Sequence, residues 1–177
     1  MDEPLDARGS AAAASATNLG RFDRVVSSPA RRAVQTVEVL ERTATIDADL
    51  RDVDYGRWAG LGIDEVAANE PASLAAWRND PESAPHGGES VAALFRRAEA
   101  FLAKSKDRTG STLAVTHAAV IRAATVAVLE APLAAFWRIE VEPLCIAQIQ
   151  WEGRFWRFRS LVNPRAAPAR RERTREP

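Results

Sequence analysis

The chain has 177 residues, which suits a single domain with a substantial core. Its 24 Lys and Arg residues balance its 24 Asp and Glu residues, so no net field favours binding to nucleic acid or to an anionic membrane. One cysteine, Cys145, excludes an internal disulfide, and with two histidines we expect no Cys/His metal site. No apolar run reaches bilayer length and no secretory signal is present, so we expect a cytoplasmic protein.

In the first half of the chain, helical and strand patterns alternate. Ala33, Val37 and Leu40 recur at three- and four-residue spacing, which is typical of the buried face of a helix. The expected elements are an alanine-rich helix over 7–20, a buried strand over 22–28, a helix from Pro29 to about Arg42, a brief strand over 43–46 and a loop over 50–60.

The second half continues the alternation and ends in a hairpin. Glu152-Gly153 is a turn signal between two apolar segments, as in a β-hairpin. The expected elements are short helices at 64–68 and 72–78, a loop over 85–90, a helix with the inner stripe Val91, Leu94, Phe95, Ala98 and Leu102, a strand over 112–117, a helix over 118–130, and hairpin strands over 144–151 and 155–161. Residues 164–177 have many arginines and no apolar periodicity, so we expect a domain over 1–163 and a disordered tail.

Strands that alternate with helices predict an α/β fold with a parallel sheet, to which the hairpin adds an antiparallel element. In such folds, ligands bind beyond the carboxyl ends of the strands. Two strand-to-helix junctions, "VVSSPARR" and "LAVTHAAV", therefore carry the candidate site.

At the first junction, Ser28 suits an N-cap and Pro29 suits the first helical position. Arg32 then falls in the first turn, where the helix macrodipole disfavours a cation, so we expect an anionic partner. Free N–H groups and a two-pronged guanidinium together suit a phosphoryl group. The alternative is a surface arginine on a well-capped helix.

At the second junction, His117 ends an apolar strand and begins a helix. A histidine there can donate to an anion and, when protonated, adds positive charge. A hydrogen-bonded structural histidine is the alternative, and the position at the ligand edge favours a functional one.

Two loops are candidates to close this site. Asp52 and Asp54 lie in "LRDVDYGRWAG", and a carboxyl group near a phosphate site can serve as a general acid; an Asx-type turn is the alternative. Gly88, Glu89 and Ser90 form a candidate substrate loop, with plain helix capping as the alternative.

Together these segments resemble the histidine phosphatase superfamily, the phosphoglycerate mutase-like family, from about Pro4 to Asn163. The family's motifs appear in order as "PLDARG", "SSPARRAVQTV", "LRDVDYGRWAG", "GGES" and "VTHAAVIR".

The resemblance implies a three-layer α/β/α sandwich with a mixed, mostly parallel sheet of six strands. It implies a phosphatase that acts on a small phosphorylated substrate through a phosphohistidine, with no metal or organic cofactor. Arg32 and His117 match the phosphate ligands, and Asp52 matches the general acid, where the family more often has glutamate; Asp54 remains a rival.

The family's "RHG" motif, which supplies the nucleophilic histidine on a central strand, has no counterpart here. The other histidine, His86, lies in the "GGES" loop rather than at a strand end. We expect a shortened sequence whose first, central strand is missing, with exposed edges on strands 112–116 and 144–151 and negligible activity. A non-catalytic relative that binds a phosphorylated ligand or a protein is the alternative.

Overall fold

The computed structural model describes residues 2–16 and 19–163. The expected disordered tail over 164–177 lies outside the described residues, and the domain boundary at 163 stays a prediction.

The central sheet has three parallel strands in the order β2-β1-β3. They are β1 (Arg24–Ser27), β2 (Thr45–Ile46) and β3 (Thr112–Val115). Ser27 of β1 lies opposite Ile46 on one side and Val115 on the other. The carboxyl ends of these strands therefore meet at one edge of the sheet, as the strand-helix alternation predicts.

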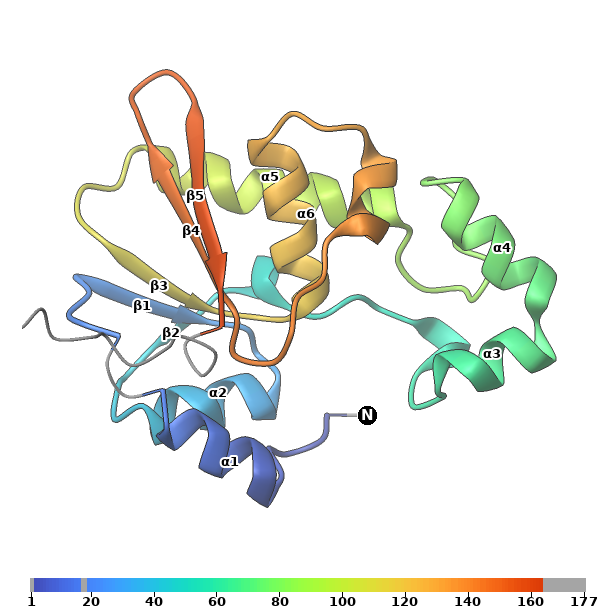
Figure 1. The fold of residues 1–177 in the computed structure, drawn as a ribbon, viewed down its shortest axis with the longest axis horizontal. Coiled ribbons are helices and arrows are strands. Elements are labelled where there is room, and N and C mark those ends of the chain that lie inside the picture. The colour runs from blue at the N-terminus through green and yellow to red at the C-terminus, as the bar shows by residue number, and fades with distance from the viewer. Residues whose placement is uncertain (1, 17–18, 164–177) are drawn as a thin grey trace, which may run out of the picture.

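The hairpin is a separate sheet. Strands β4 (Ile146–Trp151) and β5 (Trp156–Val162) pair antiparallel across the expected turn, in which Gly153 has a φ of +82°. The hairpin does not extend the parallel sheet in the described residues: β3 pairs with β1 alone and β4 with β5 alone, in line with the expected exposed edges on strands 112–116 and 144–151. Figure 1 shows β4 and β5 as a hairpin of their own.

Helices cover both faces of the central sheet and give the expected three layers (Figure 1). Helices α1 (Ala7–Ala14) and α2 (Arg31–Val39) lie on one face, and α5 (Val91–Lys106) and α6 (Ala118–Val128) lie on the other. Two short helices, α3 (Ile63–Asn69) and α4 (Pro71–Asn79), form where the sequence predicts them and extend to one side (Figure 1). Three 3-10 turns complete the described chain: Ala48–Leu50, Gly56–Trp58 and Leu133–Arg138.

Two helices differ from the sequence prediction at their ends. Helix α1 ends at Ala14 and not at the predicted Gly20. Helix α2 has Ala30 as its N-cap, so the predicted cap at Ser28 and first helical position at Pro29 are both wrong. The cause is that Ser28 still belongs to the sheet ladder, where its N–H donates to the Val115 carbonyl at 2.9 Å. Its hydroxyl accepts from the Ala30 N–H at 3.2 Å.

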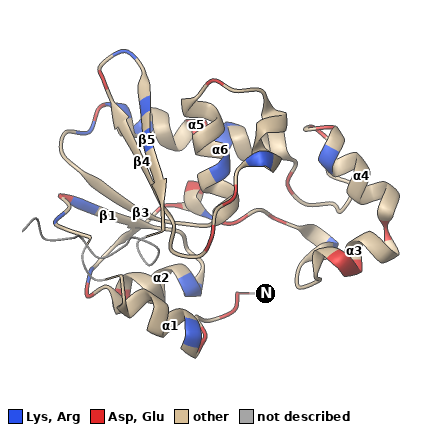
Figure 2. Ribbon diagram, in the orientation of Figure 1, with Lys and Arg blue, Asp and Glu red and all other residues tan. Residues whose placement is uncertain are grey.

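The core lies between the sheet and helices α5 and α6. The predicted stripe of α5 is buried at Val91, Leu94, Ala98 and Leu102, and Phe95 packs against it partly buried. Other core members come from the strands, the loops and α6: Val26, Leu50, Val53, Trp58, Val120, Ala123, Val126 and Phe136. Loop residues in the core fix the path of the chain between β2 and α3, which carries Asp52. Figure 2 shows acidic and basic residues mixed over the elements, in line with the zero net charge.

Candidate functional site

Four predicted side chains meet at the carboxyl edge of the sheet. Ser28 follows β1, Arg32 lies in the first turn of α2, and His117 is the N-cap of α6, two residues after the end of β3. Asp52 reaches the same point from the loop after Leu50. Because β1 and β3 are parallel neighbours, Ser28 and His117 are brought together by strand pairing alone.

Hydrogen bonds link the four residues into one cluster. The Arg32 Nη2 donates to Asp52 Oδ2 at 2.7 Å and to His117 Nδ1 at 3.1 Å. A guanidinium can only donate, so His117 Nδ1 accepts and its Nε2 carries the proton. Nε2 then donates to the Ser28 hydroxyl at 2.8 Å. The arrangement holds a neutral imidazole in a single tautomer.

The electrostatics of His117 agree with that tautomer. Burial lowers the pKa of the His117 imidazole, the Asp52 carboxylate opposes that shift, and the Arg32 cation adds to it. His117 is only 9% exposed, so the loss of hydration is large. Tyr55 lies close enough to sense the same charges: burial raises its pKa, and so does the Asp52 carboxylate.

Two carboxylates compensate the positive charge at the start of α2, where the sequence predicts an anionic partner. Asp52 forms an ion pair with Arg32. Asp2 Oδ1 accepts from the Arg31 N–H at 2.8 Å, at the positive end of the helix. Nothing in the sequence pattern indicates the contact of Asp2, because it depends on how the N-terminal segment crosses α2.

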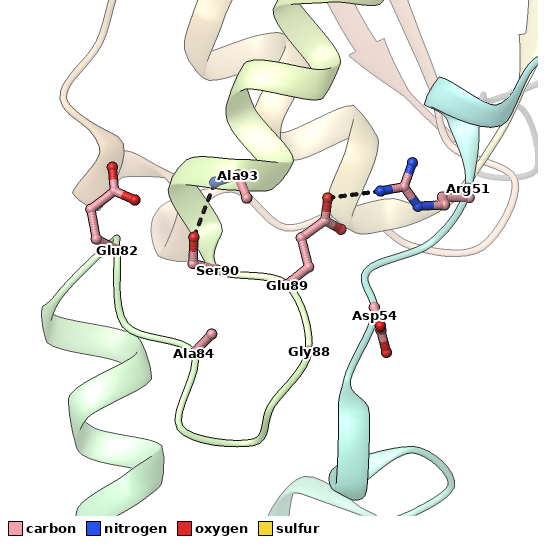
Figure 3. Close-up of a pocket in the computed structure, with 8 residues that line it drawn as sticks. All are labelled: Arg51, Asp54, Glu82, Ala84, Gly88, Glu89, Ser90 and Ala93. Atoms are coloured by element: carbon pink, nitrogen blue, oxygen red, sulfur yellow. Dashed lines mark hydrogen bonds and ion pairs between the residues drawn. The ribbon is translucent and has the colours of Figure 1, made fainter.

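The structure separates the two candidate acids. Asp52 faces Arg32 and lies 3.4 Å from His117 Nδ1. Asp54 Oδ1 accepts instead from the Gly56 N–H at 2.9 Å, an Asx-type contact, and Asp54 lines a different pocket (Figure 3). Asp52 is therefore the carboxylate that can reach a phosphoryl group held by Arg32, and its role as general acid stays a prediction.

The predicted substrate loop has contacts of its own. Ser90 accepts from the Ala93 N–H at 3.1 Å and caps α5, and Glu89 forms a buried ion pair with Arg97 at 2.7 Å. The loop lines an open pocket of about 410 Å³ (Figure 3). The pocket residues are Arg51, Asp54, Glu82, Ala84, Gly88, Glu89, Ser90 and Ala93. Within the described residues, no hydrogen bond or ion pair joins a residue of this pocket to Arg32 or His117, so a substrate role for the loop stays a prediction.

The second histidine lies elsewhere. His86 is 2% exposed, and its ring centroid lies 4.6 Å from that of Trp58 and 5.4 Å from that of Trp77. Its Nδ1 accepts from the Gly88 N–H at 3.0 Å, and burial lowers its pKa. Its Nε2 has no hydrogen-bond partner among the described residues. His86 is thus a neutral packing residue of the loop rather than a member of the cluster.

Sequence reasoning missed Arg97. It is three residues after Leu94 and falls on the buried face of α5, where a charged residue is unusual. An arginine on an otherwise apolar helix face is the feature of the sequence that could have identified it. Over the described residues, no group of His, Cys, Asp and Glu side chains is arranged to hold a metal, and no helix is long and apolar enough to cross a membrane.

Comparison with known proteins gives one consistent result. The histidine phosphatase superfamily (branch 1) matches residues 1–164. The glucosyl-3-phosphoglycerate phosphatase of Mycobacterium tuberculosis is 38% identical over 124 residues, which covers 62% of this chain and 56% of that protein. Phosphoserine phosphatase 1 of Hydrogenobacter thermophilus is 26% identical over 164 residues, which covers 87% of this chain and 78% of that protein. The chain thus spans little more than half the length of the first of these relatives.

Solved structures agree with the fold. The mycobacterial glucosyl-3-phosphoglycerate phosphatase in complex with VO3 gives a TM-score of 0.80 at 27% identity, covering 92% of this chain and 87% of that one. The putative α-ribazole-5'-P phosphatase of Escherichia coli gives a TM-score of 0.77 at 27% identity, covering 89% of this chain and 83% of that one.

Proposed function

The chain belongs to the histidine phosphatase superfamily, and from this premise we propose that it is part of a phosphatase that hydrolyses small phosphoric monoesters. The observation that carries the proposal is the cluster of Arg32, Asp52 and His117 at the carboxyl edge of the sheet. The named relatives act on glucosyl-3-phosphoglycerate and phosphoserine, which supports a small phosphorylated substrate.

Each member of the cluster has a proposed role. Arg32 and the His117 Nε2–H bind the phosphoryl oxygens, with the Ser28 hydroxyl beside them. Their donors stabilise the charge that develops as the phosphoryl group moves. Asp52 gives a proton to the leaving oxygen once it is protonated itself.

We further propose that the phosphohistidine forms on a histidine outside these 177 residues. The two histidines of the sequence are both engaged: His117 uses both ring nitrogens within the cluster, and His86 is enclosed by Trp58 and Trp77. Within the described residues, β3 and β4 each have a strand partner on one side only, so each offers main-chain groups to a further strand. These observations also favour the alternative of a relative that binds phosphorylated ligands without turnover.

Anion binding tests the cluster directly. Phosphate or vanadate at ten times its Kd should add about 1.4 kcal/mol to the free energy of unfolding and raise Tm by about 3–6 °C. Arg32→Ala or His117→Ala should remove most of that rise. Arg31→Ala is the matched control, because it removes the same charge from the exposed neighbour in the same turn. An equal rise in all four proteins would contradict the assigned site.

Turnover tests the missing nucleophile. We expect these 177 residues to hydrolyse p-nitrophenyl phosphate at least about three orders of magnitude more slowly than a form that carries a strand with a second site histidine. Robust turnover by the 177 residues that survives His86→Asn would contradict this, and would indicate a different nucleophile. Phosphate binding without turnover in either form would support the alternative of a binding relative.

A further inference from the structure

Arg97 is a buried cation outside the anion site, and all of its donors are used. The residue is 7% exposed and lies on the inner face of α5. Its Nε and Nη2 donate to the two carboxylate oxygens of Glu89 at 3.0 and 2.7 Å. The remaining N–H groups donate to the main-chain carbonyls of Asp49 at 2.6 Å, Arg51 at 2.8 Å and Asp52 at 3.4 Å.

A guanidinium is expensive to bury, and the stripe of α5 would accept an apolar side chain at this position. What an apolar residue could not do is bond to three carbonyls within four consecutive residues. Those carbonyls belong to the short segment that carries Asp52. Arg97 therefore fixes the main chain on both sides of the Asp52 Cα, and Glu89 fixes the guanidinium.

Main-chain position decides where the Asp52 carboxylate can go, because a short side chain has little freedom of its own. Its Oδ1 accepts from the neighbouring Val53 N–H at 2.9 Å, and its Oδ2 is left to face Arg32 at 2.7 Å. A displacement of this segment would move the carboxylate away from both Arg32 and His117. Because the interaction energy of two charges falls with their separation, such a displacement would change the electrostatics of the site.

We propose that Arg97 is a positioning residue of the anion site: through the carbonyls of the 49–52 segment it holds Asp52 against Arg32 and His117. The proposal rests on the proposed function for its purpose, since a general acid has to lie within reach of the group it protonates. It gives helix α5 and Glu89 a part in the site, although α5 reaches the cluster only through the main chain of Asp52 and Glu89 acts only through Arg97.

His117 reports the position of Asp52. The negative charges of Asp52 and Asp2 raise the pKa of His117, and the positive charges of Arg32 and Arg97 lower it. Arg97→Lys keeps the charge of Arg97 but loses the planar fork that reaches three carbonyls and a carboxylate together. A change in the His117 titration would therefore come from movement of Asp52 and not from a lost charge.

The experiment is an NMR titration of the two histidines in the 177-residue chain without any ligand. We expect Arg97→Lys to lower the titration midpoint of His117 by about half a pH unit, because the carboxylate moves away. In an Asp52→Ala background, the same substitution should cause no further shift, since no carboxylate is left to position. An equal shift in both backgrounds, or no shift in either, would overturn the proposal.

Two more variants complete the test. Arg96→Lys is the matched control, because Arg96 is the neighbour on α5 whose exposed ion pair with Glu82 leaves the site untouched. Glu89→Gln loosens Arg97 from the other side and should shift His117 in the same direction if Arg97→Lys fails to fold. Unfolding of both variants would make the contact a requirement of the fold and overturn its assignment to the site. Because no phosphate is used, the result is independent of whether the chain binds or hydrolyses phosphomonoesters.

Discussion

At the scale of single residues, Arg32 is the most informative, because its positive charge lies at the positive end of its own helix dipole and needs an anionic partner. The ion pair with Asp52 compensates that charge in the absence of a ligand. Arg32 and Asp52 are about one third exposed, at 36% and 30% of their side chains, so water screens the pair and an incoming anion has access to it. The pair is thus suited to exchange partners rather than to stabilise the fold.

The role of Asp52 predicts a dependence on the leaving group. In any form of the protein that turns over, Asp52→Asn should slow hydrolysis of alkyl phosphates by about 100-fold or more, because an alkoxide needs a proton to leave. The loss should be much smaller for p-nitrophenyl phosphate, whose phenolate leaves without help. Steady-state rates on the two substrates check this.

Asp54→Asn is the control for that prediction. Asp54 belongs to the same loop but lines the pocket of Figure 3. Equal losses on both substrates, or a larger loss in Asp54→Asn, would move the acid away from Asp52.

A site residue can be predicted from sequence when local secondary structure brings it to the site, and not when the packing of distant segments does. Ser28 and His117 end neighbouring parallel strands, so the alternation of strands and helices predicts that they meet. Asp2 and Arg97 reach their partners through the packing of distant segments, 29 residues apart for Asp2 and 45 to 48 for the carbonyl contacts of Arg97. Local pattern carries no such information.

At the scale of elements, two loops support the site by locking onto each other. The Glu89 N–H donates to the Asp54 carbonyl at 2.7 Å, and the Arg57 N–H donates to the His86 carbonyl at 3.1 Å. This approach is possible because Gly88 has no side chain: a Cβ there would lie 2.1 Å from the Asp54 carbonyl oxygen. In the "GGES" motif, Gly88 is therefore required for the close contact between the main chains of the two loops.

Gly88→Ala should therefore be costly. We expect a loss of about 2–3 kcal/mol in the free energy of unfolding, because the new methyl group meets main-chain atoms that cannot turn aside. Urea denaturation measures it. Gly62→Ala is the control, since a Cβ at Gly62 meets nothing within 4 Å, and it should cost less than about 1 kcal/mol. Similar losses in the two variants would contradict the packing argument.

Sequence patterns predict the buried faces of the helices but not every helix boundary or strand pairing. The apolar stripe of α5 predicts its buried face, while the start of α2 is displaced from Pro29 to Arg31 because the sheet keeps Ser28 in its ladder. The separation of the hairpin from the parallel sheet cannot be predicted from alternation alone. Alternation predicts that strands exist, but the pairing of β3 with β4 depends on whether a strand lies between them.

At the scale of the whole molecule, buried histidines make stability depend on pH. Burial lowers the pKa of both His86 and His117 below the ordinary value of 6.5, so the folded chain keeps both neutral where the unfolded chain binds protons. Stability rises with pH wherever the unfolded state binds more protons. The contribution of these histidines is therefore complete above the unfolded value and is lost as pH falls below it.

The carboxyl groups act in a separate range. Hydrogen bonds from Arg57 and Trp58 lower the pKa of Glu70 from 4.5 to about 2. A lowered carboxyl pKa contributes stability above the unfolded value, and that contribution is lost only as pH falls from 4.5 toward 2. Glu70 thus contributes no pH dependence in the range where the histidines titrate.

We accordingly expect the free energy of unfolding to be lower at pH 5.5 than at pH 7.5, as measured by urea denaturation at each pH, because this interval spans the ordinary histidine pKa of about 6.5. His86→Asn should reduce the difference between the two values even if it destabilises the protein at both, because it removes one of the two groups that the unfolded chain protonates. A Glu70→Gln variant should leave the difference unchanged. Stability that stays constant or increases as the pH falls through this interval would show that neither imidazole is held neutral, and would contradict the hydrogen-bonding pattern assigned to the cluster.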